Sequence, residues 1–136
     1  GVFLQALYVY QLNAFFADDW KGSVGCPYHW LFWHTPHGLR AQNAQLPKWK
    51  GGWHFSYMGT AETRRRKVQA GGDAAFDSEA ILAQLEERAA RLEDPMGRPF
   101  PDGLQPGRLM PVDGSFPPYL REHPERFPGW IGEVPT

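Results

Sequence analysis

The stretch from Gly51 to Glu62 holds the densest set of side chains that could do chemistry in this sequence. It contains three aromatic residues, a histidine and three glycines, and it ends on a carboxylate. A strand followed by a tight turn and a helix N-terminus presents unpaired N–H groups, which suit an anion or a sugar. The residue types therefore indicate a site for such a ligand, with His54 and Glu62 as its ionisable groups.

The elements that position this site follow from the spacing. Aromatic positions 53, 55 and 57 alternate with positions 54, 56 and 58, which predicts a short strand. Gly51 and Gly52 let the backbone turn or approach a ligand closely. Thr60 is expected to cap a helix that runs to Ala70, with Gly71–Gly72 as its stop. The plainer alternative is that Trp53 and Tyr57 belong to the core and that His54 is their hydrogen-bonded partner.

The same string resembles the motif of glycosyltransferase family 17, the β-1,4-mannosyl-glycoprotein N-acetylglucosaminyltransferases and their bacterial relatives. That motif reads roughly Gly-Trp-His-x-Ser-aromatic, followed by a Glu and a Lys on the next helix. The matching residues are Gly52, Trp53, His54, Ser56, Tyr57, Glu62 and Lys67. Further matches cover most of the chain: Tyr8 to Asn13, Trp20 with Gly22, Leu39-Arg40, Asp94 with Arg98, and Pro118 to Leu120. The segment Ala70–Asp73 departs from the aromatic-Ala-His-x-Glu segment that the family often carries.

The resemblance implies an α/β fold, specifically the C-terminal portion of a GT-A-like nucleotide-sugar transferase domain. The full enzyme would move N-acetylglucosamine from UDP-N-acetylglucosamine to a glycan acceptor with inversion. It would use a divalent metal, Mn or Mg, whose acidic ligands lie upstream, so this fragment alone is expected to bind no metal and to be inactive.

The positions of the motif residues also indicate roles in the full enzyme. His54 would contact the donor diphosphate or its metal. Glu62, the only acid within the motif, is the candidate catalytic base, with an ordinary charge at a helix N-terminus as the alternative. The expected substrate-binding residues are Gly51, Gly52, Trp53, Ser56, Tyr57, Arg40 and Lys67. Arg40 is a candidate partner for a phosphate or carboxylate, with a surface role as the alternative. A different class of function stays open, namely a non-catalytic carbohydrate-binding or interaction module whose aromatic side chains stack on sugar rings.

Length and composition set further bounds. A chain of 136 residues has room for one domain or part of one. We expect an α/β body over 1–94 and a Pro-rich ordered tail over 95–136, anchored by Phe100, Phe116, Tyr119, Phe127 and Trp130. The net charge of −1 provides no electrostatic reason to expect nucleic acid as a partner.

Cys26 is the single cysteine, which excludes an internal disulfide and indicates a reducing setting. No apolar run approaches the roughly 20 residues that span a bilayer, so no transmembrane segment is expected in this chain. Together these points favour a cytoplasmic location if the protein is bacterial, with the Golgi lumen as the alternative.

Other segments are read from their periodicity. Apolar residues at 3, 4, 7, 8, 12, 15 and 16 predict a helix over Phe3–Phe16 that ends at Asp18 and Asp19. We expect a short strand over Trp20–Gly25, a short helix over Gly38–Gln45, and an amphipathic helix over Ser78–Glu93. The whole would form a three-layer α/β fragment. His29, His34 and His37 lie close in sequence, but Pro36 and Gly38 interrupt any shared helix face, which argues against a metal site built from them.

Overall fold

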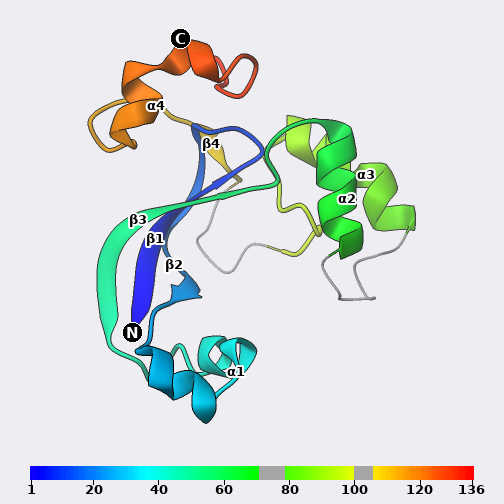
Figure 1. The fold of residues 1–136 in the computed structure, drawn as a ribbon. Helices are drawn as coiled ribbons and strands as arrows, with labels where there is room; N and C mark the ends of the chain where they lie inside the picture. Colours follow the sequence, from blue (N-terminus) through cyan, green and yellow to red (C-terminus); the bar gives the residue numbers. More distant parts are fainter. Residues whose placement is uncertain (71–78, 100–105) are drawn as a thin grey trace. The chain divides into compact units, whose positions relative to one another are not determined.

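The computed structural model describes residues 1–70, 79–99 and 106–136, and within them the chain forms two units (Figure 1). The first unit contains Gly1–Leu7 and Ala17–His54, and the second contains Tyr8–Phe16 and Phe55–Thr136. Three expectations lie outside the described residues: the helix stop at Gly71–Gly72, the start at Ser78 of the helix expected over Ser78–Glu93, and the anchor Phe100.

Four strands form one sheet, in the order β3-β1-β2-β4. The strands are β1 (Val2–Val9), β2 (Ala14–Val24), β3 (Lys48–Ser56) and β4 (Arg108–Leu109). The backbone N–H of Val2 donates to Pro47 O (2.7 Å) and that of Tyr10 to Ser56 O (3.0 Å), so β1 and β3 run parallel. β2 and β4 pair antiparallel, with Ala14 opposite Leu109. The mixed sheet and its helices confirm an α/β class, and the motif strand lies in the sheet as expected.

The helix expected over Phe3–Phe16 is wrong. This stretch forms β1, a turn, and the first residues of β2, and Tyr10 in the turn has a positive φ of 72°. β1 is flanked by a strand on each side, and the chain is buried at three consecutive positions at its end: Tyr8, Val9 and Tyr10. The apolar residues at 3, 4, 7 and 8 do not alternate along β1, so their spacing matched a helix, and strand pairing on both sides decided the conformation.

The expectation that Asp18 and Asp19 end a helix is also wrong, because both residues lie inside β2. Both side chains are exposed. Asp19 has a φ of 59°, a conformation that Asp adopts more readily than most residues, and its carboxylate lies 3.6 Å from Lys50 Nζ. The strand expected over Trp20–Gly25 is confirmed as the second half of β2.

The rest of the first unit connects β2 to β3 through a 3-10 helix, η1 (Tyr28–Phe32), and a short helix, α1 (Pro36–Ala41). Thr35 caps α1, because its Oγ1 accepts a hydrogen bond from Gly38 N at 3.0 Å. α1 confirms the helix expected near Gly38, although it starts and ends earlier in the chain. Leu39 is its buried residue.

In the second unit, α2 (Ala61–Ala70) follows the motif strand and packs with α3 (Glu79–Ala90). Thr60 caps α2 as expected, with its Oγ1 accepting from Thr63 N at 3.3 Å. The buried residues between the two helices are Val68, Leu82 and Leu85, with Tyr57 and Met96 packed against them. The amphipathic pattern of α3 is thus confirmed.

The C-terminal segment of the second unit contributes β4, α4 (Pro118–Glu122) and a 3-10 turn, η2 (Pro124–Arg126). Phe116 is 1% exposed and its ring lies 5.2 Å from that of Tyr8, so it anchors this segment as expected. The same expectation is wrong for Tyr119 and Trp130, which stay 55% and 41% exposed. Among the described helices, none is both long enough and apolar enough to cross a membrane.

Candidate functional site

The motif stretch is shared between the two units. Residues 51–54 belong to the first unit, and residues 55–62 belong to the second. The structure therefore brings the predicted site residues together in two groups. The first group surrounds His54 and the second surrounds Tyr57.

His54 of β3 stacks on Trp20 of β2. Their ring centroids lie 3.6 Å apart, and the ring planes differ by 21°. The indole of Trp20 covers Gly22, where an added Cβ would come within 1.6 Å of the ring. Residue 22 must therefore be glycine for the indole to lie in this place, and the indole in turn orients the imidazole. The pairing of Trp20 with Gly22 in the sequence has this physical cause.

Gly51 and Gly52 adopt the backbone conformations for which their position in the sequence suggested glycine. Gly51 and Gly52 have φ values of 153° and 88°, which side-chain-bearing residues rarely adopt. A Cβ on Gly51 would meet no atom within 4 Å, so a ligand could approach this backbone without obstruction. Trp53 beside them is 38% exposed, and its carbonyl accepts a hydrogen bond from Gln5 Nε2 at 3.3 Å. These three residues form an accessible surface of the first unit.

A pocket of about 480 Å³ lies next to the Trp20–His54 stack. Its lining includes Trp20, Lys21, Gly22, His37, Arg40 and Asn43. Arg40 thus lies where its guanidinium can meet a ligand. Lys21 and His37 are pocket residues that sequence reasoning missed as ligands, because their position beside Arg40 depends on how the chain brings α1 next to β2.

The second group centres on Tyr57, which has a φ of 56° and is half-buried at the end of β3. The ammonium of Lys67 lies 5.1 Å from the centroid of its ring, a cation–π contact. Burial raises the pKa of the Tyr57 hydroxyl, with nearby Arg98 opposing that shift and Asp94 adding to it. Ser56 is buried, and its carbonyl holds Tyr10 N. Ser56, Tyr57 and Lys67 therefore have structural partners within this unit.

Burial also raises the pKa of Tyr10, with the Asp94 carboxylate adding to the shift. The hydroxyl of Tyr10 donates to Glu93 O at 2.8 Å, and Asp94 pairs with Arg98 at 2.7 Å. The phenol is thus kept in its neutral, hydrogen-bonding form. This contact joins the turn after β1 to the segment after α3.

Glu62 lies in the first turn of α2 and is exposed. Its carboxylate pairs with Arg66 Nε at 2.9 Å, one helical turn further on. Such exposed pairs are weak, so the carboxylate remains accessible. Glu62 belongs to the second unit, whereas His54 belongs to the first.

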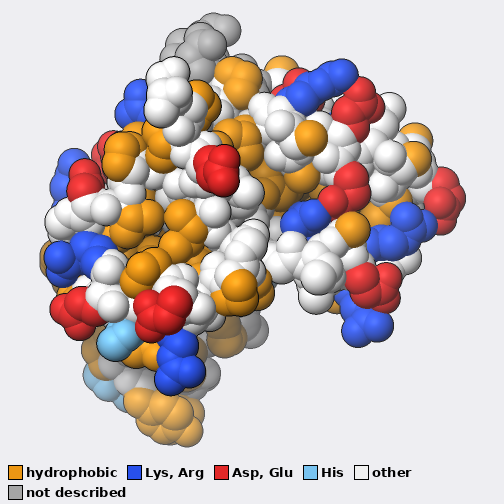
Figure 2. All heavy atoms as spheres, turned by 90° about the horizontal axis from the view of Figure 1, so that it is seen from above, with side chains coloured by type: hydrophobic (Ala, Val, Ile, Leu, Met, Phe, Trp, Pro, Cys, Tyr) orange, Lys and Arg blue, Asp and Glu red, His pale blue; other side chains and the backbone are white. Residues whose placement is uncertain are grey.

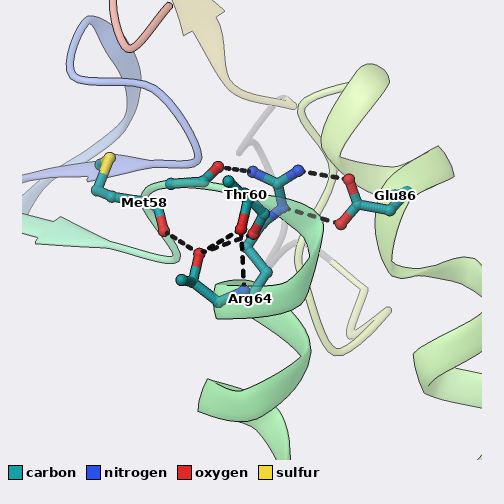
Figure 3. A network of polar contacts seen from close by, with 6 residues as sticks. Met58, Thr60, Arg64 and Glu86 are labelled. Carbon is teal, nitrogen blue, oxygen red and sulfur yellow. Dashed lines mark hydrogen bonds and ion pairs between the residues drawn. The ribbon is translucent and has the colours of Figure 1, made fainter.

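Arg64 is the one member of the basic run that is largely buried, with 14% of its side chain exposed. Its guanidinium donates to both carboxylate oxygens of Glu86 on α3 and, at 2.6 Å, to Gly59 O (Figure 3). Thr63 Oγ1 donates to Met58 O at 3.2 Å in the same network (Figure 3). This network fixes the turn between β3 and α2. Sequence reasoning missed it, because four consecutive cations look alike until the partner helix is present.

A divalent cation at His54 would need carboxylate ligands, which the resemblance places upstream of this chain. Mn and Mg sites are built from oxygen ligands, usually carboxylates. From Trp20 to Ala61 the sequence has no Asp or Glu, and Asp19 is paired with Lys50. Among residues 1–70, 79–99 and 106–136, no three His, Cys, Asp or Glu side chains are grouped to hold a metal ion. No step below is therefore assigned to a metal at His54.

Several residues that carry the family resemblance are buried and have a structural role. Tyr8, Tyr10, Leu12 and Asn13 are all at most 7% exposed. Asn13 Nδ2 donates to Met110 O and Gly132 O, each at 2.9 Å, and its Oδ1 accepts from Gly132 N. These residues hold the hairpin turn to the C-terminal segment. Other residues that carry the resemblance are exposed, among them Trp53, Arg40, Glu62, Lys67 and Tyr119.

The visible surface shows no large field of one charge. Figure 2 shows Lys and Arg side chains interspersed with Asp and Glu side chains on the face that it presents. This distribution agrees with the net charge of −1. Comparisons of the chain with models of protein families, with curated proteins and with solved structures return no match.

Proposed function

We propose that this chain is part of an inverting glycosyltransferase that moves N-acetylglucosamine from UDP-N-acetylglucosamine to a glycan acceptor. It would form the C-terminal portion of a GT-A-like domain. The observation that supports this most is the stack of His54 on Trp20 over Gly22, beside the pocket that holds Arg40. These residues were singled out by their resemblance to family 17, and they lie on β2, β3 and α1, yet they make one local arrangement.

The stack defines what His54 can do. Its ring plane is held against the indole, so its two nitrogens lie at the ring edge, where they make hydrogen bonds in the plane. An imidazole with this restricted orientation is suited to contact a diphosphate oxygen or a sugar hydroxyl. Gly51 leaves the adjacent backbone accessible to the same ligand.

Glu62 is the proposed base. In an inverting transfer, the acceptor hydroxyl attacks the anomeric carbon of the donor sugar, the bond from that carbon to the UDP oxygen breaks, and the hydroxyl proton passes to a carboxylate. UDP leaves with the electrons of the broken bond. Glu62 can take the proton once its exposed pair with Arg66 opens, which costs little in solvent.

The proposal is tested with the protein translated from the complete reading frame that contains this chain. Transfer of labelled N-acetylglucosamine from UDP-N-acetylglucosamine to a mixture of glycans is expected. Glu62→Gln should lower turnover by about 10²-fold or more with donor affinity unchanged, because it keeps the shape and removes the basicity. Arg126→Gln, a change on η2, serves as the control and should retain turnover.

Absence of transfer from any nucleotide sugar would contradict the proposed reaction. Near-normal turnover in Glu62→Gln would contradict only the role of Glu62. In the isolated chain of 136 residues we expect no turnover, because the acidic metal ligands are predicted to lie upstream.

A second candidate function is favoured by one observation. Several aromatic side chains of the first unit are strongly exposed: Tyr28 (77%), Phe32 (73%), Trp33 (84%) and Trp49 (50%). Exposed aromatic rings bind the apolar faces of sugars, so a non-catalytic carbohydrate-binding module would also present such side chains. Glycan binding by the complete protein without any transfer would favour this alternative.

A further inference from the structure

The pocket beside the Trp20–His54 stack is lined by two cationic side chains, an imidazole and no acid. Lys21 of β2 and His37 and Arg40 of α1 line it, and Asn43 adds an amide. No lining residue is Asp or Glu, and the sequence has none between Trp20 and Ala61. The lining therefore attracts an anion and offers no local competitor for it.

The charged members of this lining have no partner in the described structure. Within residues 1–70, 79–99 and 106–136, no ion pair and no side-chain hydrogen bond involves Lys21, His37 or Arg40. By contrast, Arg64, Arg66 and Arg98 are each paired with a carboxylate. A guanidinium and an ammonium that line one pocket, and are left unpaired, are suited to a phosphate or carboxylate, which Arg binds through two parallel hydrogen bonds.

Trp20 is the aromatic residue in the lining of this pocket. Trp20 covers Gly22 there, and its stack on His54 keeps the indole from swinging away. The indole of Trp20, together with the cations of Lys21 and Arg40, suits a ligand that combines a ring with an attached anionic group. A volume of about 480 Å³ lies within the range of ordinary small-molecule sites.

We propose that this pocket binds the anionic group of an acidic saccharide, with the sugar ring against Trp20, so that the glycan acceptor is an acidic one. This inference rests on the proposed transferase function, because it names the acceptor class of that reaction. The shared chemistry is an oxyanion on a sugar ring, which either a phosphate or a carboxylate supplies.

Binding to the complete protein is measured by calorimetry with three sugars that differ in one group: glucose 6-phosphate, glucuronate and glucose. The two acids should bind at least about tenfold more tightly than glucose, and their order tells which oxyanion the pocket prefers. Arg40→Gln and Lys21→Gln should each weaken the binding of the preferred acid by about tenfold. Arg66→Gln removes an exposed cation that is not among the lining residues and is the matched control, with affinity unchanged.

Circular dichroism and thermal unfolding confirm that each variant is folded. Equal affinity for glucose and the two acids would overturn the inference, and so would unchanged binding in Arg40→Gln. Inorganic phosphate that binds as tightly as glucose 6-phosphate would also overturn it, because the sugar ring would then contribute nothing. Tighter binding of UDP that is lost in Arg40→Gln would assign the pocket to the donor and not to the acceptor.

The inference and the proposed function fail in different ways. If the pocket binds acids selectively but the protein transfers no sugar from nucleotide sugars, the inference about the pocket holds and the proposed transferase function is wrong. If Arg40→Gln transfers sugar to neutral glycans at an unchanged rate, the proposed transferase function holds and the inference of an acidic acceptor is wrong.

Discussion

The imidazole of His54 lies flat against the indole of Trp20, with centroids 3.6 Å apart, and the same indole fills the space where residue 22 would carry a Cβ. Three positions of the first unit, two on β2 and one on β3, therefore depend on one another. A side chain at residue 22 would overlap the rigid indole ring. Such a substitution must therefore displace Trp20 and, with it, the stacked imidazole of His54.

Gly22→Ala tests this dependence. The added methyl would lie 1.6 Å from a ring carbon, so the indole must leave its place, and we expect a loss of about 1–3 kcal/mol in the free energy of unfolding. Chemical denaturation measures it. Gly114→Ala is the control, since its Cβ would meet no atom within 4 Å, and it should change stability by no more than about 0.5 kcal/mol. A similar effect of both substitutions would contradict the packing of Trp20 on Gly22.

Asn13→Ala should be among the most destabilising changes in the second unit. Asn13 is 1% exposed and makes three hydrogen bonds to the backbone of Met110 and Gly132. Its removal leaves buried backbone groups unpaired, each costing about 1–3 kcal/mol. Thermal unfolding should show a drop in Tm of several degrees or more, whereas Gln45→Ala, on an exposed loop, should leave Tm nearly unchanged.

Arg64→Met tests the network that joins α2 to α3. It removes the hydrogen bonds to Glu86 and Gly59 O but keeps the length of the side chain, and we expect a loss of about 1–3 kcal/mol. Arg66→Gln breaks only the exposed pair with Glu62 and should cost less than about 0.5 kcal/mol. If the two variants unfold at the same denaturant concentration, the buried role of Arg64 is wrong.

The hydrogen bonds from Arg64 lower the pKa of Glu86, and this shift has a consequence in acid. A lowered folded pKa stabilises the protein at pH values above the unfolded pKa of about 4.3, and that contribution is lost as the pH falls through the folded value. The stability difference between the wild type and Glu86→Gln should therefore shrink as the pH falls from about 6 to about 3. Denaturation at several pH values measures it, and a constant difference would exclude this ion pair.

Tyr10 provides the corresponding test in base. Its folded pKa is raised, mainly by burial, whereas an unfolded tyrosine loses its proton near pH 10. Stability should therefore fall as the pH rises above about 10 toward the folded value, because only the unfolded state releases the proton there. Tyr10→Phe should show a shallower fall over this range, and it should cost about 1 kcal/mol at neutral pH through loss of the bond to Glu93 O. Equal slopes in the two proteins would contradict the burial of this hydroxyl.

Local features of the sequence determined those elements whose signals are contained within a few residues. The alternation after Gly52 predicted β3, and Thr60 predicted the start of α2, because strand faces and helix caps depend on near neighbours. The apolar face of α3, with Leu82 and Leu85, followed from helical periodicity in the same way. The resemblance to family 17 likewise came from the sequence alone, and it remains the basis of the proposed reaction.

Tertiary structure decided whatever depends on a partner distant in the chain. Residues 3–16 form a hairpin and not a helix, because β1 pairs with strands on both sides, whereas its apolar residues do not alternate and so did not identify a strand. Lys21 and Arg40 line one pocket only because α1 lies next to β2, and Arg64 differs from Arg66 only because Glu86 faces it. A sequence lists these cations without their partners, and the partners set whether each one supports the fold or remains available to a ligand.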